Sequence, residues 1–247
     1  MRKLDYGTDA PGVIRNLFVI AGLLLLALVF APHRVGPFRS GGADVTVELR
    51  GMLAGGAVAC LIGGALMILY AEWGKFRHRD RMLAMVAWTG AENVLDVGTG
   101  RGLLALGAAK NLTTGTAVGI DVWSPKDLTG NTADAFLANA EAEGVAERVE
   151  VRHADARALP FPDGSFDVVL SNVCLHNIPD AGGRADACHE IARVLKRGGV
   201  ALVSDFIRTG DYARSFTAAG LTVTHTGPHV LDVFPPLRVV RAEKAAG

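Results

Sequence analysis

The sequence is poor in cysteine, in aromatic residues and in net charge. Its 247 residues include three cysteines that form neither a C-x-x-C pair nor the spacing of a metal site, so we expect a reducing compartment and no bound metal. Aromatic residues make up only 6% of the chain, and 25 Lys and Arg residues balance 25 Asp and Glu residues. Because no basic block is interleaved with aromatic residues, no nucleic-acid partner is expected.

Two long uncharged runs stand out against this balance. Residues 17–32 and 51–70 contain no charged side chain, and the first run reaches the length of a membrane span if Arg15 extends to the interface. We therefore predict a membrane anchor over residues 1–72 with two transmembrane helices, at about 13–32 and 51–70. A cleavable signal peptide is the alternative for the first run, but Asp5 and Asp9 precede it and no A-x-A site follows it.

The charges that flank these runs predict their orientation. Basic residues lie before the first run (Arg2, Lys3, Arg15), after the second (Lys75, Arg77, Arg79, Arg81) and, fewer in number, between them (Arg34, Arg39, Arg50). The positive-inside rule then places both termini, with a catalytic domain over residues 73–247, on the cytoplasmic side. Gly51 and Gly55 form a G-x-x-x-G pattern, which favours close packing of the two helices with each other or in a homodimer.

The most informative segment is an apolar strand that runs into three glycines, Val94-Leu95-Asp96-Val97-Gly98-Thr99-Gly100-Arg101-Gly102. Glycines at every second position let the backbone turn sharply and admit a ligand close to the main chain. A second apolar strand ends at Asp121, about 20 residues on, where a ribose-binding carboxylate is expected. The pattern is not the G-x-G-x-x-G of a pyrophosphate site, and Asp96 would repel a pyrophosphate but favour a cationic ligand. S-adenosylmethionine is such a ligand.

On these residues the chain resembles the class I S-adenosylmethionine-dependent methyltransferases, in particular the branch of ubiquinone and menaquinone biosynthesis methyltransferases. The resemblance covers roughly residues 81–208. It implies an α/β fold, a Rossmann-like, seven-stranded, mostly parallel sheet with helices on both faces, here preceded by the transmembrane helical hairpin. It also implies S-adenosyl-L-methionine as the cofactor, with S-adenosyl-L-homocysteine as the product.

The resemblance assigns cofactor-binding roles residue by residue. The glycine loop matches the family's first motif, Asp121 matches the acidic residue that holds the ribose, and Asp155 matches the residue that contacts the adenine amino group. Arg197 stands where the family usually has proline. The predicted cofactor-binding residues are Asp96, Gly98, Thr99, Gly100, Gly102, Asp121, Val122, Asp155, Ala156 and Asn172.

Apolar strands and helices alternate along the rest of the chain, which is the order of an α/β fold with a parallel sheet. Strands are expected near residues 93–97, 117–121, 149–153, 166–171, 200–206, 222–225 and 237–241. Helices are expected near residues 76–88, 102–110, 132–143, 184–195 and 212–219. Ligands of such sheets bind beyond the carboxyl ends of the strands, where the polar candidates named above fall, together with Asp205.

Methyl transfer asks for few catalytic groups, because the sulfonium is already an activated leaving group and the enzyme mainly aligns the acceptor and excludes water. The candidate base is His176, just past the fourth strand, with Asn177 and Asp205 as candidate orienting groups. A loop histidine bonded to the backbone is an equally good interpretation. Cys174 is expected to pack rather than react.

The short catalytic domain and the anchor favour a small, lipophilic acceptor that arrives from the lipid bilayer. Its pocket would be completed by the helix around residues 73–78 and lined at its apolar end by residues 227–236. Two other functions stay open at this point. One is a catalytically inactive S-adenosylmethionine-binding scaffold, since a fold does not establish turnover. The other is a nicotinamide-dependent oxidoreductase, for which G-x-G-x-x-G spacing and a Tyr-x-x-x-Lys pair are missing.

Overall fold

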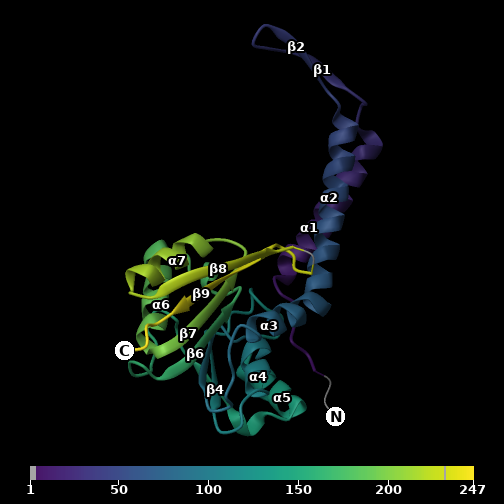
Figure 1. Ribbon diagram of the computed structural model, residues 1–247. Helices are drawn as coiled ribbons and strands as arrows, with labels where there is room; N and C mark the ends of the chain where they lie inside the picture. Colours follow the sequence, from purple (N-terminus) through teal and green to yellow (C-terminus); the bar gives the residue numbers. More distant parts are fainter. Residues whose placement is uncertain (1–3, 231) are drawn as a thin grey trace.

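Strands and helices alternate from residue 93 onward in the computed structural model, which describes residues 4–230 and 232–247 (Figure 1). The helices are α1 (Pro11–Phe30), α2 (Leu49–Leu69), η1 (Tyr70–Gly74), α3 (Lys75–Leu83), α4 (Leu103–Ala109), α5 (Ala133–Glu143), η2 (Ala146–Arg148), η3 (Leu175–Asn177), α6 (Ala181–Val194) and α7 (Thr209–Ala218). The strands are β1 (Val35–Ser40), β2 (Ala43–Val47), β3 (Asn93–Val97), β4 (Thr116–Asp121), β5 (Val149–His153), β6 (Phe166–Asn172), β7 (Leu195–Asp205), β8 (Thr222–His229) and β9 (Leu237–Glu243).

Seven strands form the central sheet of the described residues, in the order β5-β4-β3-β6-β7-β9-β8. β3 pairs in parallel with β4 on one side and with β6 on the other, whereas β9 runs antiparallel to both of its neighbours. The chain therefore changes direction across the sheet between β3 and β6, and a crevice for a ligand forms at such a switch point. The predicted seven-stranded, mostly parallel, Rossmann-like sheet is confirmed.

The sheet has an apolar core on each face, because successive side chains of a strand point to opposite sides. Val168 and Leu170 of β6 pack in one cluster with residues of α3, α4 and α5. Val169, which lies between them, packs in a second cluster with residues of α6 and α7. The prediction of helices on both faces is confirmed, and the two layers hold the strand ends in fixed positions.

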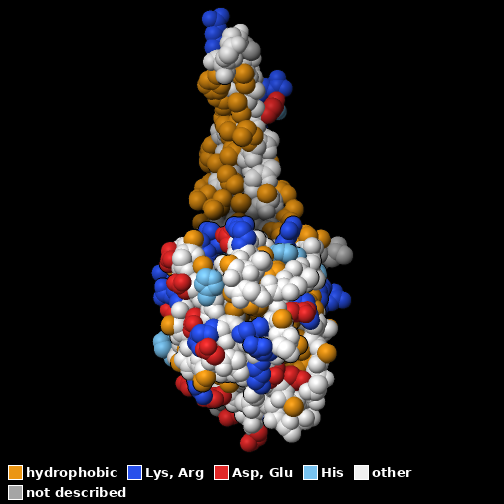
Figure 2. Space-filling model, turned by 60° about the vertical axis from the view of Figure 1, so that its left-hand side comes forward, with side chains coloured by type: hydrophobic (Ala, Val, Ile, Leu, Met, Phe, Trp, Pro, Cys, Tyr) orange, Lys and Arg blue, Asp and Glu red, His pale blue; other side chains and the backbone are white. Residues whose placement is uncertain are grey.

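The first two helices form an apolar hairpin that projects away from the sheet (Figures 1 and 2). The exposed fractions of Leu23, Leu26 and Val29 on α1 are 61%, 59% and 66%. Both helices are long and apolar enough to cross a membrane, and only 11% of the apolar window of each is buried. Core helices of a soluble domain would be mostly covered, so the hairpin presents apolar surface that water does not favour.

Packing within this hairpin uses glycines of α2 other than the pair Gly51 and Gly55. A Cβ on Gly64 of α2 would lie 2.8 Å from the ring of Phe18 on α1, and one on Gly56 would lie 3.2 Å from Leu24. Added Cβ atoms on Gly51 and Gly55 would meet nothing within 4 Å. The G-x-x-x-G face is therefore open, and a homodimer through it stays a prediction.

The segment between the two helices, expected as a loop, is a two-stranded β-hairpin at the far end of the helices (Figure 1). Gly41 and Gly42 form its turn with φ values of 59° and 85°. Two successive positive φ angles are typical of a type I′ turn, which suits the twist of a short hairpin. In the sequence, this hairpin is indicated by the Gly-Gly pair between two segments that contain Val and Phe.

Helix α2 continues through η1 into α3, so the apolar hairpin is joined to the sheet domain by one unbroken helical segment. A Cβ on Gly74 of η1 would lie 2.1 Å from the carbonyl oxygen of Asp232, so the connection between β8 and β9 touches the helix backbone here. Arg81 of α3 also pairs with the carboxylate of Asp232 at 2.7 Å. The predicted helix over residues 76–88 is shorter than expected, because α3 ends at Leu83. The contacts with Asp232 make this helix a rigid tether.

The segment before α1 differs from the predicted division at residue 72, because residues 5–10 pack on the sheet domain. Tyr6 is buried, lies edge-on to Phe76 with ring centroids 5.6 Å apart, and donates a hydrogen bond of 2.8 Å to Glu143. Asn139 of α5 bonds both the backbone N–H and the backbone carbonyl of Asp5, at 3.1 and 2.9 Å. We call residues 5–10 the N-terminal strap.

Candidate cofactor site

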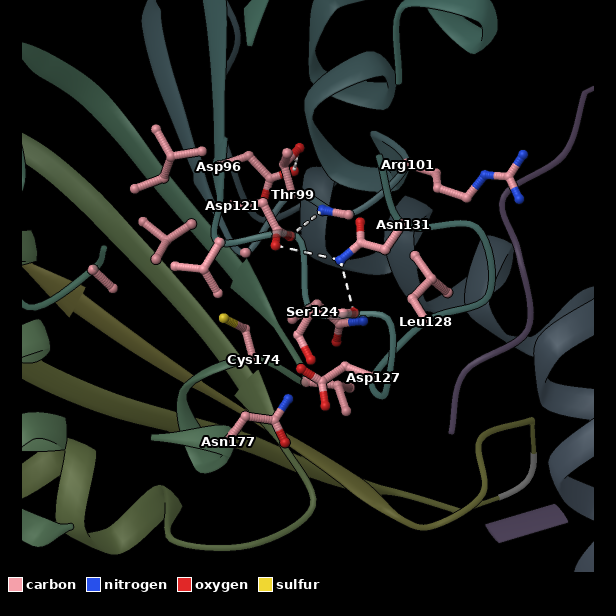
Figure 3. A pocket seen from close by; sticks show the side chains of 18 of the residues that line it. Asp96, Thr99, Arg101, Asp121, Ser124, Asp127, Leu128, Asn131, Cys174 and Asn177 are labelled. Atoms are coloured by element: carbon pink, nitrogen blue, oxygen red, sulfur yellow. Dashed lines mark hydrogen bonds between the residues drawn. The ribbon is translucent and has the colours of Figure 1, made fainter. Parts of the chain in front are cut away.

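A cavity of about 580 Å³ lies at the carboxyl ends of β3, β4 and β6 (Figure 3). Nine of the ten predicted cofactor-binding residues line it: Asp96, Gly98, Thr99, Gly100, Asp121, Val122, Asp155, Ala156 and Asn172. The tenth, Gly102, does not. An added Cβ on Gly102 would lie 2.8 Å from Leu106 and 3.0 Å from Phe136, so this glycine allows α4 and α5 to pack closely.

The turn after β3 needs glycine for a steric reason that the structure makes explicit. Gly98 has a φ of 73°, and a Cβ there would lie 2.1 Å from the sulfur of Cys174. The turn therefore packs directly against Cys174, which follows β6 and also lines the cavity. Burial raises the pKa of the Cys174 thiol, which keeps it protonated, as expected of a packing residue.

Asp121 ends β4 with its carboxylate fixed beside this turn. One oxygen accepts a hydrogen bond of 2.8 Å from the Gly100 N–H, and the other accepts bonds from the Trp123 N–H at 2.7 Å and from Asn131 at 3.3 Å (Figure 3). These donors orient the carboxylate at the wall of the cavity. The Oδ1 atom of Asn131 is buried and accepts no hydrogen bond from the described residues, so it offers a place for a donor group of a ligand.

Asp96 has a more structural position than we expected from a residue proposed to attract a cation. Its carboxylate accepts hydrogen bonds from the Thr99 hydroxyl at 2.8 Å and from the Ala105 N–H at 3.0 Å, so it joins the turn to the start of α4. Burial raises its pKa to about 7, and the nearby charge of Asp121 adds to this effect. Asp96 and Asp121 thus occupy the N–H groups that a pyrophosphate would need.

The far side of the cavity is formed by residues after β4 and β5. Asp155 lines it and is paired with Arg157 at 2.6 Å, which holds the pKa of the Asp155 carboxyl below its ordinary value. Val122 lines it too and is 54% exposed, an apolar surface suited to the face of a flat ring. Asp121 and Asp155 both face the crevice above the glycine turn, as an adenosine site requires.

His176, the candidate base, lies outside the set of residues that line the cavity. The short helix η3 turns Cys174 and Asn177 toward the cavity and His176 away from it. Its Nδ1 atom lies 3.1 Å from the carboxylate of Asp205, and its ring stacks edge-on to Phe206 at 4.8 Å. Asp205 is fully buried and also accepts a hydrogen bond from Tyr212. The structure thus places His176 outside the lining of this cavity and beside Asp205, and its role as the base stays a prediction.

Three cavity residues were missed because they belong to segments interpreted as membrane anchor or tether. They are Tyr6 and Asp9 of the strap and Lys75 of α3. Lys75 is buried, and its Nζ donates to the backbone carbonyls of Tyr6 and Gly7. Helix residues 73–78 contribute to this cavity through Lys75, and their part in an acceptor pocket stays a prediction. The residues described in the segment 227–236 do not line it; Val233 instead packs on Tyr70.

Comparison with known proteins agrees with this geometry. A family model described as a methyltransferase domain matches residues 95–203. The chain is 34% identical over 137 residues to 27-O-demethylrifamycin SV methyltransferase of Amycolatopsis mediterranei, covering 55% of this chain and 46% of that protein. It is 32% identical over 131 residues to a ubiquinone/menaquinone biosynthesis C-methyltransferase of Geobacter sulfurreducens, covering 53% and 48%.

Among solved structures, an O-methyltransferase family protein from Burkholderia thailandensis has the same fold, with a TM-score of 0.59 at 17% identity over 96% of this chain and 72% of that one. The glycine turn, the carboxylate after β4 and the strand order together define an adenosine-binding α/β methyltransferase fold. The chain thus contains a methyltransferase domain over residues 95–203, and its relatives and fold support a class I S-adenosylmethionine-dependent methyltransferase, with S-adenosylmethionine as the cofactor. It spans about half the length of the curated relatives that it matches.

Proposed function

We propose that the protein transfers the methyl group of S-adenosylmethionine to a small, lipophilic acceptor while its apolar hairpin is embedded in a membrane. The observation that carries the proposal is the cavity next to the glycine turn, with carboxylates at the ends of successive strands. The match to a methyltransferase domain supports the reaction class. The exposed apolar hairpin supports the place where the reaction occurs.

The cavity fits an adenosine that carries a charged amino-acid end. Asp121 would bind the ribose hydroxyls, and Val122, Asp155 and Ala156 would surround the adenine. The bare backbone at Gly98 leaves room for the chain that bears the sulfur. Bound S-adenosylmethionine supplies an activated methyl group on a positively charged sulfur. The protein then has to hold the acceptor in line with that methyl group and keep water out.

A dinucleotide is a poor fit for the same cavity. In nicotinamide-binding folds, free N–H groups at the helix start receive the pyrophosphate. Here Asp96 accepts from Ala105 and Asp121 accepts from Gly100, so carboxylates already occupy those donors. This arrangement argues against the oxidoreductase alternative.

Several features support insertion of the hairpin with the sheet domain on the cytoplasmic side. Trp73, which is 67% exposed, lies just after α2, where an aromatic residue favours a membrane interface, whereas Tyr70 is buried. Basic residues of α3 follow directly. Of the residues before α1 on which the orientation was based, Arg2 and Lys3 lie outside the described residues. Since cells hold S-adenosylmethionine in the cytosol, the cofactor requires the same side.

The membrane side of the cavity supports an acceptor that arrives from the bilayer. Tyr70, at the end of the second apolar helix, packs in one cluster with Val233, Leu237 and Val173, and Val173 lines the cavity. Apolar side chains thus connect the helix end with the cavity wall. A lipophilic acceptor such as a quinone precursor, an isoprenoid or a lipid would find apolar contacts along this route.

The proposal is tested with the full chain in detergent micelles. Calorimetry should show binding of S-adenosylhomocysteine and none of NADH, and Asp121→Ala should weaken the binding by at least about tenfold, because a hydrogen-bonded carboxylate is lost. Radioactive methyl from S-adenosylmethionine should then appear in an organic extract of membranes. NADH binding alone would overturn the cofactor assignment. Methyl transfer only to water-soluble metabolites would overturn the lipophilic acceptor.

One observation keeps a second function in view. His176 is not among the residues that line the cavity, although methyl transfer from a sulfonium does not by itself require a base there. A scaffold that binds S-adenosylmethionine without turnover would bind S-adenosylhomocysteine equally well but leave the membrane extract unlabelled. The same experiment therefore separates the two functions.

A further inference from the structure

The N-terminal strap forms part of the wall of the cofactor cavity, although it precedes the first apolar helix in the chain. Its backbone bonds the loop between β4 and α5: the Thr8 N–H donates to the Thr129 hydroxyl at 2.8 Å, and the Ala10 N–H donates to the Asp127 carbonyl at 3.0 Å. Asp9 forms an isolated β-bridge with Leu128 between these two contacts. The strap is therefore docked in register, and the side chain of Asp9 lines the cavity.

The side chain of Asp9 is 37% exposed, but one oxygen of its carboxylate lacks a hydrogen-bond donor. Its Oδ2 atom is shielded from solvent and accepts no hydrogen bond from the described residues. The nearest cation, Lys75, lies 3.9 Å away and directs its protons to the Tyr6 and Gly7 carbonyls instead. Partial burial raises the pKa of the Asp9 carboxyl, and the nearby charge of Lys75 opposes this effect. A buried acceptor of this kind calls for a donor from a ligand.

A second oxygen of the cavity also lacks a hydrogen-bond donor. Asn172, at the end of β6, lines the cavity, and its Oδ1 atom is buried without a hydrogen-bond partner among the described residues. Its amide nitrogen lies 3.5 Å from the hydroxyl of Tyr70, at the end of the second apolar helix. Two acceptors from distant segments therefore line one cavity, and each can accept a hydrogen bond from a ligand.

We propose that Asp9 is a ligand-binding residue of this site, and that its carboxylate accepts a hydrogen bond from an ammonium or hydroxyl group of the bound molecule. The proposal rests on the proposed function. Two molecules of that reaction carry such a donor: the cofactor, with the ammonium group of its amino-acid end, and an acceptor with a hydroxyl group. In the second case the acceptor oxygen bonds to the methyl carbon as the carbon–sulfur bond breaks, and the hydroxyl proton passes to Asp9.

The assignment makes the apolar hairpin part of the site. Asp9 lies two residues before α1, and Lys75, which holds the strap, begins α3 at the end of the α2–η1 segment. Both ends of the helical hairpin therefore meet at the cavity. A methyltransferase domain separated from residues 1–72 would lack this wall.

The test compares Asp9→Asn with Asp5→Asn in the full chain in detergent micelles. Both variants remove one carboxylate from the strap, but Asp5 pairs with Arg101 and does not line the cavity. Each protein is titrated with S-adenosylhomocysteine and with 5′-methylthioadenosine, which lacks the amino-acid end. The initial rate of label transfer to the membrane extract is measured in parallel, and circular dichroism checks the fold.

Loss of a charge-assisted hydrogen bond is expected to cost at least about tenfold. If the cofactor supplies the donor, Asp9→Asn weakens S-adenosylhomocysteine by that factor and leaves 5′-methylthioadenosine unchanged. If the acceptor supplies it, both affinities hold and the rate falls by that factor. Asp5→Asn should stay within about threefold of the natural protein in each readout.

Unchanged affinity together with an unchanged rate for Asp9→Asn overturns the assignment. Where the extract yields no labelled product, the titration alone decides, and an unchanged S-adenosylhomocysteine affinity overturns it. Failure of the proposed function looks different, because the natural protein itself would then bind neither S-adenosylhomocysteine nor 5′-methylthioadenosine.

Discussion

The two walls of the cavity are built in different ways. The sheet wall consists of the glycine turn and Asp121, which neighbouring strands hold through hydrogen bonds between β3 and β4. The strap wall consists of Tyr6, Asp9 and Lys75. Tyr6 and Asp9 precede the apolar hairpin in the chain, and Lys75 follows it. The first wall is local and carries its signal in one short motif. The second exists only once distant segments have docked, so the two should respond differently to substitution.

The largest effect is expected from Gly98→Ala in the sheet wall. The new Cβ would overlap the sulfur of Cys174, at 2.1 Å, and the positive φ adds backbone strain. Overpacking of this kind costs about 3 kcal/mol. If the turn relieves the overlap by shifting into the cavity, S-adenosylhomocysteine should bind about 100-fold more weakly, as measured by calorimetry.

The matched control for this substitution is Gly144→Ala. Gly144 has a similar φ of 69°, but an added Cβ would meet nothing within 4 Å. The Gly144→Ala variant carries the backbone strain without the overlap, and it should bind S-adenosylhomocysteine as the natural protein does. Adding Cys174→Gly to Gly98→Ala should restore part of the affinity. If the two alanine variants bind alike, steric contact with Cys174 is not the reason for glycine at this position.

The strap wall should fail at Tyr6. Tyr6→Ala removes a buried ring from the core and should lower the free energy of unfolding by about 3 kcal/mol, measured by denaturant unfolding of the sheet domain in micelles. Tyr6→Phe loses only the hydrogen bond to Glu143 and should cost about 1 kcal/mol. S-adenosylhomocysteine affinity should fall in the alanine variant and persist in the phenylalanine variant. Equal unfolding energies for the two would mean that the strap is not docked in solution.

Protonation of Asp96, next to the glycine turn of the sheet wall, should make the stability of the protein depend on pH. Asp96 has a folded-state pKa of about 7, raised above its ordinary value, so the folded protein binds more protons than the unfolded chain between about pH 4 and 7. The contribution of Asp96 to stability is therefore full at low pH and is lost as the pH rises through 7. The slope is at most about 1.4 kcal/mol per pH unit for one proton.

Asp96→Asn tests this dependence, because asparagine keeps the shape of the side chain but binds no proton. Relative to the natural protein, its free energy of unfolding should rise as the pH increases from 4 to 7, in urea titrations at each pH. A difference between the two proteins that does not change with pH would show that Asp96 is ionised throughout the range.

The smallest effect is expected within the apolar hairpin that carries the strap. Gly64→Ala would press on the Phe18 ring and should destabilise the hairpin by about 1 kcal/mol, measured by thermal unfolding in micelles. Gly55→Ala faces open space and should be neutral within about 0.5 kcal/mol. Loss of a dimer in the Gly55 variant, seen by cross-linking, would instead identify the open glycine face as a dimer contact.

The same contrast explains how far the sequence predicts the structure. The strands over residues 93–97 and 149–153 agree with β3 and β5 in both bounds, because an apolar run marks β3 and alternating apolar residues mark the edge strand β5 locally. The glycine motif likewise identified the residues of the sheet wall. Asp9 and Lys75 carried no such mark, since flanking charges beside an apolar run have an ordinary explanation at a membrane surface.

His176 illustrates a limit of a different kind. Its position after β6 was predicted correctly, but a single turn of helix, η3, decides which of three consecutive side chains faces the cavity. Spacing along the chain does not determine that choice. The contact between His176 and Asp205 could be anticipated because both follow neighbouring strands, β6 and β7, at the same edge of the sheet.

The docked strap has a consequence for the order in which the protein assembles. Tyr6 and Glu143 are 137 positions apart, so the strap finds its contacts only after α5 has been synthesised. By then both apolar helices have left the ribosome. Long-range contacts of this kind form late in folding. The strap side of the cavity therefore closes late, once the segments on either side of the hairpin have come together.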